Sequence, residues 1–171
     1  MKTDGNPMKT IFLIGFMGVG KSAVADCLNR EYGMRRIEMD EAIEQKEQMS
    51  ISELFARKGE PYFRQLETDL IASLESADNT VVSCGGGVAM RKENVELMRR
   101  IGRVVLLTAT PETILSRVTE NDDRPLLRGK KNVRDIAALM EARRPAYEAA
   151  ADLTVAVDGK TPQEICGEIL K

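Results

Sequence analysis

The chain has 171 residues, 43% of them hydrophobic and 30% charged, which is the composition of one soluble globular domain with a full core. Its 25 basic and 27 acidic residues leave a net charge of -2, which argues against nucleic acid as the main partner. The chain contains no histidine, so histidine-based triads, imidazole general bases and histidine-ligated zinc sites are excluded.

The cysteines and the N-terminal segment bear on where the protein works. Cys27, Cys84 and Cys166 lie far apart and form no CxxC pair, which fits a reducing cytoplasm better than a disulfide framework or a zinc site. We expect residues 1–8 to be a flexible leader and residues 9–171 a single domain. Glycines interrupt the first apolar run, so it predicts neither a signal peptide nor a membrane span. We expect a cytoplasmic monomer with no membrane partner.

Short apolar runs alternate with longer amphipathic stretches in the first half of the chain. The predicted strands are Thr10–Ile14, Arg36–Met39 and Thr80–Cys84. The predicted helices are Lys21–Tyr32, Asp40–Gln48, Ser50–Lys58 and a stretch that carries Phe63, Leu66, Leu70 and Leu74 on one face. Gly59 is typical of a helix end and Pro61 of a helix start, so a break is expected between the last two helices.

The second half continues the alternation. Helices are predicted around 91–101, over 111–120, over 132–150 and from Thr161 to Leu170, with strands over 103–108 and 153–157. Five strands alternating with helices predict an α/β fold, with a five-stranded parallel sheet covered by helices on both faces. Such sheets bind ligands beyond the carboxyl ends of their strands, so the site is expected in the loops that follow the strands.

The segment from Gly15 to Ser22, GFMGVGKS, matches the pattern GxxxxGK[ST] between a predicted strand and a predicted helix. Its glycines let the backbone approach phosphate oxygens, and the helix N-terminus favours negative charge there. Lys21 can then reach the β- and γ-phosphates, and Ser22 can ligate Mg²⁺. The sequence therefore favours a nucleotide phosphate site.

An alternative reading of the same stretch is a dinucleotide fingerprint. Gly18-x-Gly20-x-x-Ala23 fits that pattern, and Asp40 lies about where a ribose-binding carboxylate would follow. This alternative gives no role to the adjacent lysine and serine, which makes it the weaker interpretation.

Glu38 and Asp40 stand two residues apart at the end of the second predicted strand, so an extended chain would point both to one side. One carboxylate could hold Mg²⁺ through water while the other accepts a hydrogen bond from a substrate hydroxyl. The competing interpretation is that Asp40 only caps the helix that follows.

Two further features lie near the middle of the chain. Arg64 and Glu67 are three residues apart on a predicted helix, where an ordinary surface ion pair is the default expectation. The run Gly85 to Gly87 follows a strand directly, which indicates a loop that approaches a ligand closely, or else a plain flexible turn.

Two arginine-containing segments remain open in the same way. The polar stretch 121–131 suits a mobile lid that brings Arg124 onto a transferring phosphate, or a solvated loop. Arg143 and Arg144 precede Pro145, which can mark a helix kink or end, while the two guanidinium groups could also bind a carboxylate.

Together these residues resemble the shikimate kinases, a P-loop kinase family. The segments that carry the resemblance, in the family's order, are the GFMGVGKS loop, Asp40-x-x-Ile43-Glu44, Phe63-Arg64-x-x-Glu67, the Gly85–Gly87 loop, Arg124-Pro125-Leu126-Leu127 and Arg143-x-x-x-Tyr147. The resemblance implies a three-layer P-loop kinase fold with a mobile lid. It also implies that the γ-phosphoryl group of ATP passes to the 3-hydroxyl of shikimate, giving shikimate 3-phosphate and ADP.

The resemblance implies a role for each matching position. The ATP-binding residues would be Gly18, Val19, Gly20, Lys21, Ser22, Ala23, Arg117 and Arg124, with Arg117 against the adenine and Arg124 closing from the lid. The substrate-binding residues would be Asp40, Arg64, Gly85, Gly86, Gly87 and Arg143, the two arginines gripping the shikimate carboxylate. The catalytic residues would be Lys21, Asp40 and Arg124, with Ser22 and Glu38 holding Mg²⁺ as the cofactor and Glu67 supporting Arg64.

Two positions depart from the family's pattern. Glu38 stands where the family usually has aspartate, and Ala23 stands where a second hydroxyl residue is common. The extra methylene of Glu38 predicts a changed metal dependence. Two other functions stay open: a different small P-loop kinase acting on gluconate or a nucleotide, and a nucleotide-binding protein without turnover.

Overall fold

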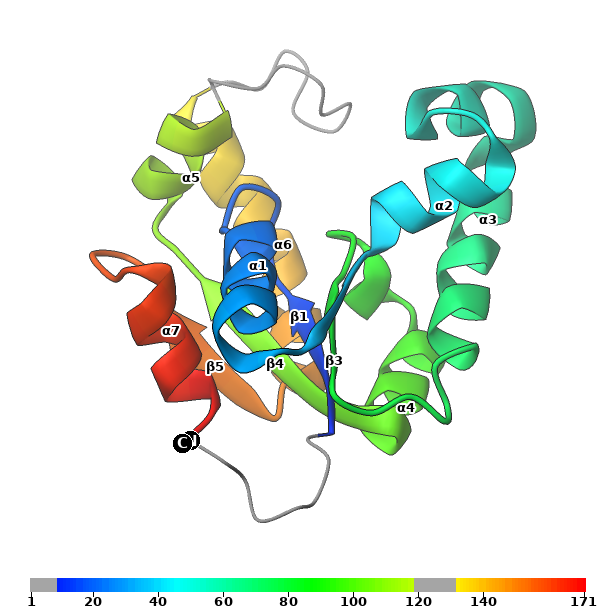
Figure 1. Ribbon diagram of the computed structural model, residues 1–171. Coiled ribbons are helices and arrows are strands. Elements are labelled where there is room, and N and C mark those ends of the chain that lie inside the picture. The colour runs from blue at the N-terminus through cyan, green and yellow to red at the C-terminus, as the bar shows by residue number, and fades with distance from the viewer. Residues whose placement is uncertain (1–8, 119–131) are drawn as a thin grey trace.

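A computed structural model describes residues 9–118 and 132–171 (Figure 1). Its five strands are β1 (Thr10–Ile14), β2 (Arg35–Glu38), β3 (Thr80–Ser83), β4 (Gly102–Thr108) and β5 (Leu153–Ala156). They form one sheet in the order β2-β3-β1-β4-β5, and every neighbouring pair is parallel. The predicted five-stranded parallel α/β fold is therefore confirmed.

The helices fill the connections between the strands. They are α1 (Lys21–Tyr32), α2 (Met39–Glu47), α3 (Ile51–Ala72), the 3₁₀ turn η1 (Val88–Met90), α4 (Lys92–Ile101), α5 (Pro111–Val118), α6 (Val133–Ala150) and α7 (Pro162–Ile169). Among the described residues, none of these helices is long and apolar enough to cross a lipid bilayer.

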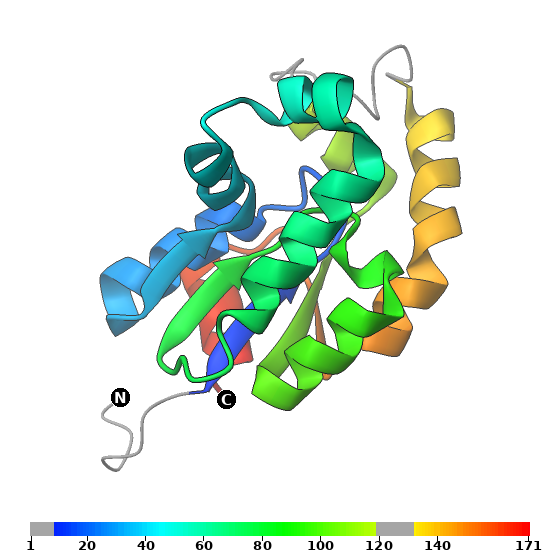
Figure 2. The ribbon, with the colours of Figure 1, turned by 90° about the vertical axis from the view of Figure 1, so that its right-hand side faces the viewer.

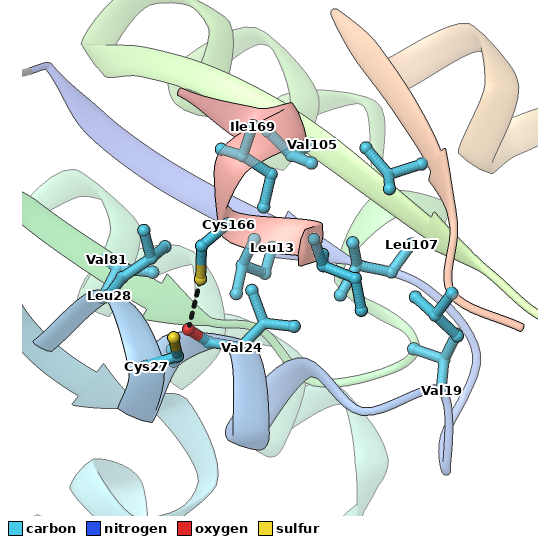
Figure 3. Close-up of a cluster of buried hydrophobic side chains, with 14 of the residues drawn as sticks. Leu13, Val19, Val24, Cys27, Leu28, Val81, Val105, Leu107, Cys166 and Ile169 are labelled. Carbon is cyan, nitrogen blue, oxygen red and sulfur yellow. Dashed lines mark hydrogen bonds between the residues drawn. The ribbon is translucent and has the colours of Figure 1, made fainter. Parts of the chain in front are cut away.

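Alternate residues of the central strands feed two cores, one on each face of the sheet. Ile11 and Leu13 of β1 point into a cluster shared with α1, α5 and α7, part of which Figure 3 shows. Phe12 and Ile14 point the other way, into a cluster shared with α2, α3 and α4. This alternation is the two-residue period of a strand buried on both faces, and it produces the three layers.

The long helix α3 is broken near its start, as the sequence predicts. Gly59 has φ 81° and ψ 166°, which is not helical, and Pro61 opens the second part. Ser50 caps the first part, because its side chain accepts a hydrogen bond from the N–H of Glu53. Figures 1 and 2 show α2 and this first part of α3 projecting past the edge at which the strands end.

The expectation for the second strand was wrong in one respect. Met39 is the first residue of α2 and not the last of a strand, and Asp40 lies in the first turn of that helix. The extended alternation expected for Glu38 and Asp40 therefore does not apply. Asp40 is not the cap of α2 either, because Glu38 holds the N-cap position. Met39 is fully buried, so packing draws it into the helix without a loop.

The two segments that the sequence left open in the second half have different outcomes. Helix α6 continues through Pro145, so this proline does not mark the end of the helix. Asn132 is the cap of α6 and accepts a hydrogen bond from the N–H of Asp135. The predicted lid and Arg124 lie outside the described residues, as does the predicted leader.

Candidate active site

The phosphate-binding sequence forms the turn between β1 and α1. Gly18 and Gly20 have φ angles of 83° and 103°, in the left-handed region that glycine adopts freely. A Cβ atom on Gly18 would lie 2.9 Å from the Cγ1 of Val118, and one on Gly20 would lie 2.8 Å from Arg117 Nη1. Both positions therefore need glycine. The turn delivers the N-terminus of α1, whose first N–H groups have no partner inside the helix.

Lys21 and Ser22 open α1 with their side chains at this turn. Lys21 Nζ donates a hydrogen bond to the carbonyl of Gly15 at 2.5 Å, so its charge stands directly beside the loop. The Ser22 hydroxyl donates to Glu38 Oε2 at 3.0 Å, which joins the start of α1 to the end of β2. The ammonium group of Lys21 and the side-chain oxygens of Ser22 and Glu38 therefore lie at the start of α1, where phosphates would meet the helix.

A cavity of about 250 Å³ brings most of the predicted residues together. The predicted residues that line it are Gly18, Gly20, Lys21, Ser22, Glu38, Asp40, Gly85, Gly86 and Arg117. It joins the loop after β1 to the ends of β2 and β3, which is where a parallel sheet places a ligand site.

Three lining residues were not predicted from the sequence: Met17, Ser83 and Cys84. Ser83 ends β3 and Cys84 follows it, so their place directly before the glycine run was the signal that could have found them. Burial raises the pKa of the Cys84 thiol well above its ordinary value. Cys84 is therefore a neutral thiol at physiological pH and no nucleophile.

Two described residues that are predicted to bind ATP, Val19 and Ala23, are not among those that line the cavity. Val19 is 1% exposed and packs in the core, so only its backbone is available to a phosphate. Ala23 is exposed on the first turn of α1. Arg117 Nη1 donates to the carbonyl oxygens of Val19 at 2.7 Å and Gly18 at 3.3 Å, which places its guanidinium over the phosphate loop.

The donor set at this edge fits a magnesium ion that arrives with phosphates. Ser22 Oγ and Glu38 Oε2 are hard oxygen donors, the type that Mg²⁺ prefers. The described residues contain no cluster of three or more acidic, cysteine or histidine side chains able to hold a metal alone. Mg²⁺ commonly binds through one or two protein oxygens, with water and substrate phosphates completing its shell.

Each glycine of the run Gly85 to Gly87 faces a charged side chain. A Cβ atom would lie 2.7 Å from Glu67 Oε2 at Gly85, 3.1 Å from Arg143 Nη1 at Gly86 and 2.5 Å from Arg64 Nη1 at Gly87. The run is therefore a closely packed loop and not a plain flexible turn. Gly87, Arg64 and Arg143 do not line the cavity itself, but the two arginines touch the glycine loop that forms its wall.

The ion pair between Arg64 and Glu67 is not the surface pair that its spacing suggests. The two side chains are 2.8 Å apart, and the Glu67 side chain is fully buried. Burial raises the pKa of the Glu67 carboxyl, although the bond from Arg64 acts against this change. Burial alone would lower the pKa of Arg64, but the hydrogen bond and charge of Glu67 raise it above its ordinary value. The pair thus keeps a charged guanidinium beside Gly87.

Arg143 and Tyr147 approach the same loop from α6. The Tyr147 hydroxyl donates to the carbonyl of Gly86 at 2.5 Å, and burial raises the pKa of this phenol. The Arg143 guanidinium lies 5.9 Å from the centre of the Phe16 ring. Arg143 Nη1 and Glu67 Oε2 are both buried without a hydrogen-bond partner among the described residues. Buried polar groups are normally hydrogen-bonded, so these two atoms need a partner from water or from a ligand.

Comparisons with known proteins agree with this arrangement. The family model described as shikimate kinase matches residues 17–171. A shikimate kinase of Persephonella marina is 42% identical over 163 residues, which cover 95% of this chain and 98% of that protein. The structure of a shikimate kinase from Acinetobacter baumannii in complex with shikimate has a TM-score of 0.88 and 30% identity, and the match covers 95% of this chain and 91% of that one.

A likeness to a different kinase extends only to the fold. A gluconokinase from Sinorhizobium meliloti is 18% identical with a TM-score of 0.57, and the match covers 95% of this chain and 89% of that one. The match of the family model and the near-complete coverage of the relative with 42% identity establish that this chain belongs to the shikimate kinase family.

Proposed function

We propose that this chain transfers the γ-phosphoryl group of ATP to the 3-hydroxyl of shikimate, producing shikimate 3-phosphate and ADP. The observation that carries the proposal is that one cavity is lined by the phosphate loop, by Asp40 and by the Gly85–Gly86 wall. A phosphate donor and a small acceptor can therefore meet there. The family membership identifies the acceptor that this wall would hold.

On the donor side, the chain supplies positioning and charge. The loop from Gly18 to Ala23 would surround the ATP phosphates, and Lys21 would turn its amine onto the transferring group. Ser22 and Glu38 would hold Mg²⁺, which when bound neutralises charge on the phosphate oxygens. Phosphoryl transfer through a loose transition state depends mainly on such positioning and charge stabilisation.

On the acceptor side, the chain supplies a carboxylate site and a hydroxyl site. The unpartnered Nη1 of Arg143 and the guanidinium of Arg64 would grip the shikimate carboxylate in a paired geometry. Asp40 Oδ1 would lie 3.4 Å from a Cβ atom on Gly85, on the same side of the loop as Glu67. Asp40 would accept hydrogen bonds from shikimate hydroxyls and assist removal of the 3-hydroxyl proton.

Some roles remain predictions. Arg117 would lie against the adenine, and its hydrogen bond to the carbonyl of Val19 supports a place beside the nucleotide. Arg124, outside the described residues, would close over the phosphates. The three free, buried cysteines are compatible with the proposed cytoplasmic location.

The test is Mg²⁺-dependent release of ADP from ATP, with shikimate, gluconate and several nucleoside monophosphates offered separately. Lys21→Ala is the blank, because losing its charge should lower kcat/KM by a factor of about 10² to 10³. Release with shikimate alone supports the proposal. ADP release with another acceptor would show that shikimate is not the substrate. Nucleotide binding without ADP release would show that the chain is not a kinase.

The acceptor site has its own pair of variants. Arg143→Ala should raise the KM for shikimate because it removes the buried guanidinium, while the KM for ATP stays the same. Arg144→Ala is the matched control, since Arg144 is exposed and pairs with Glu141 at 2.6 Å away from the loop. Equal KM values for shikimate in both variants would contradict the proposed role of Arg143.

A further inference from the structure

Arg36 contacts the carboxylate proposed to hold Mg²⁺. Both residues lie on β2, two positions apart, so their side chains share one side of the strand. Arg36 Nε and Nη2 donate to Glu38 Oε1 at 3.0 and 2.8 Å. The other oxygen, Oε2, accepts the bond from Ser22 at 3.0 Å. The two oxygens of the Glu38 carboxylate therefore have different partners. Oε1 accepts both hydrogen bonds from Arg36, and Oε2 accepts the hydrogen bond from Ser22 at the start of α1.

The guanidinium is itself anchored from α1. Arg36 Nη1 lies 3.4 Å from Asp26 Oδ1, and Asp26 also pairs with Arg30 at 2.7 Å. The Glu38 side chain is 14% exposed and that of Arg36 33% exposed. Arg36 does not line the cavity, whereas Glu38 does. Arg36 thus holds Glu38 from behind, on the side away from the cavity.

A fixed carboxylate matters more for glutamate than for aspartate. Glutamate has one more rotatable bond, so more conformational freedom must be lost before its oxygens take one position. Two donors on Oε1 restrict that extra torsion and leave Oε2 beside the Ser22 hydroxyl. Partners of this kind orient a metal-holding carboxylate and are worth a substantial part of the metal affinity.

We propose that Arg36 is a positioning residue for the Mg²⁺ that enters with the nucleotide, because it fixes the Glu38 carboxylate with Oε2 beside Ser22. This inference rests on the proposed function, which supplies the Mg²⁺ nucleotide. It concerns orientation of the donor side only, so the acceptor site is unaffected.

The test is calorimetric titration of ADP at a series of Mg²⁺ concentrations, which measures the gain in ADP affinity that Mg²⁺ brings. Arg36→Met removes the donors and keeps an apolar stem. We expect the gain to fall about tenfold, the low end of losses seen when the partner of a metal-holding group is removed. ADP affinity without Mg²⁺ should stay unchanged. Arg36→Lys, which keeps the charge without the two-donor fork, should restore part of the gain.

A matched control and a double variant decide whether the effect runs through Glu38. Arg30→Met removes the same charge from the same network without touching Glu38, so its gain should equal that of the wild type. In a Glu38→Ala background, Arg36→Met should cause no further loss. The proposal is overturned if Arg36→Met leaves the Mg²⁺-dependent gain in ADP affinity unchanged. It is also overturned if Arg36→Met lowers that gain as much in the Glu38→Ala background as in the wild type.

The outcome is separable from the proposed function. Mg²⁺-dependent ADP binding that responds to Arg36 but comes with no shikimate phosphorylation overturns the proposed function and supports the positioning role. If shikimate is phosphorylated but the Mg²⁺-dependent gain in ADP affinity is the same with and without Arg36, the proposed function is supported and the positioning role is overturned. Melting temperatures close to that of the wild type confirm that each variant is folded.

Discussion

Replacing Gly87 by alanine should damage acceptor binding without damaging the fold. Gly87 has φ −95° and ψ −1°, the conformation of the third residue of a type I turn, which most residues including alanine can adopt. The new Cβ atom would lie 2.5 Å from Arg64 Nη1, and ordinary contact begins at 3.4 Å, so the guanidinium has to retreat by about 0.9 Å. Misplacing a substrate-positioning group by about 1 Å can cost about 100-fold. That factor corresponds to about 2.7 kcal/mol.

Steady-state kinetics and thermal melting measure the two consequences separately. We expect the KM for shikimate to rise by about 10- to 100-fold while the KM for ATP stays within about twofold. Stability should fall only modestly, because the obstacle is a side chain and not backbone, although the displaced guanidinium weakens its pair with the buried Glu67.

The matched control is Gly167→Ala, where an added Cβ atom meets nothing within 4 Å. Its kinetic constants should equal those of the wild type, and its stability should rise slightly because Gly167 lies within α7. An unchanged KM for shikimate in Gly87→Ala would refute the reasoning, since it would mean that the position of Arg64 does not matter to the acceptor.

Three further predictions concern stability and reactivity. The hydroxyl of Thr113, which donates to Asp158 at 2.7 Å, is the main cause of the lowered pKa of that carboxyl. The ionised carboxylate stabilises the fold fully above its ordinary pKa of 3.8, and this stabilisation is lost as the pH falls through the lower pKa of the folded state. The melting temperatures of wild type and Asp158→Asn should therefore converge when the pH is lowered from 7 to below 4. Burial raises the pKa of the Cys166 thiol to about 12, and all three cysteines are buried, so a thiol reagent should label none in the folded protein and three in denaturant; labelling before unfolding would contradict this. Asn94→Leu should cost about 1–3 kcal/mol in denaturant unfolding, because it removes two buried hydrogen bonds: the one from Asn94 Nδ2 to the carbonyl of Val88 at 3.1 Å and the one from the Thr68 hydroxyl to Asn94 Oδ1 at 2.6 Å; a neutral variant would show that these bonds contribute little.

Elements bounded by visible turn chemistry were predictable from the sequence. The helix Lys21–Tyr32 has the predicted limits because Gly20 and Gly33 flank it in left-handed conformations that glycine favours. The break at Gly59 was predictable for the same reason. The start of α2 was not, because no glycine, proline or asparagine marks it and Met39 joins the helix through packing against distant residues. The strand order is also invisible locally, since it depends on pairings between remote segments.

Parts of the candidate site were likewise predictable from the sequence, and parts were not. The phosphate loop could be predicted because its residues are contiguous and its backbone demands glycine. Helical spacing predicted the contact of Arg64 with Glu67 but not the burial of Glu67, which is set by the glycine loop after β3. The hydrogen bonds from Arg36 to Glu38 were missed, although their spacing on one strand was a usable signal.

The central place of β1 in the sheet has a consequence for synthesis on the ribosome. The strand leading into the phosphate loop pairs Ile11 with Val81 on one side and with Arg103 on the other. A nascent chain that has just passed Gly33 carries the entire loop motif but neither neighbouring strand. The entropy of closing these long connections has to be overcome before β1 is held on both sides. A short N-terminal fragment should therefore fail to bind nucleotide, and we expect the phosphate site to form only after β4 has left the exit tunnel.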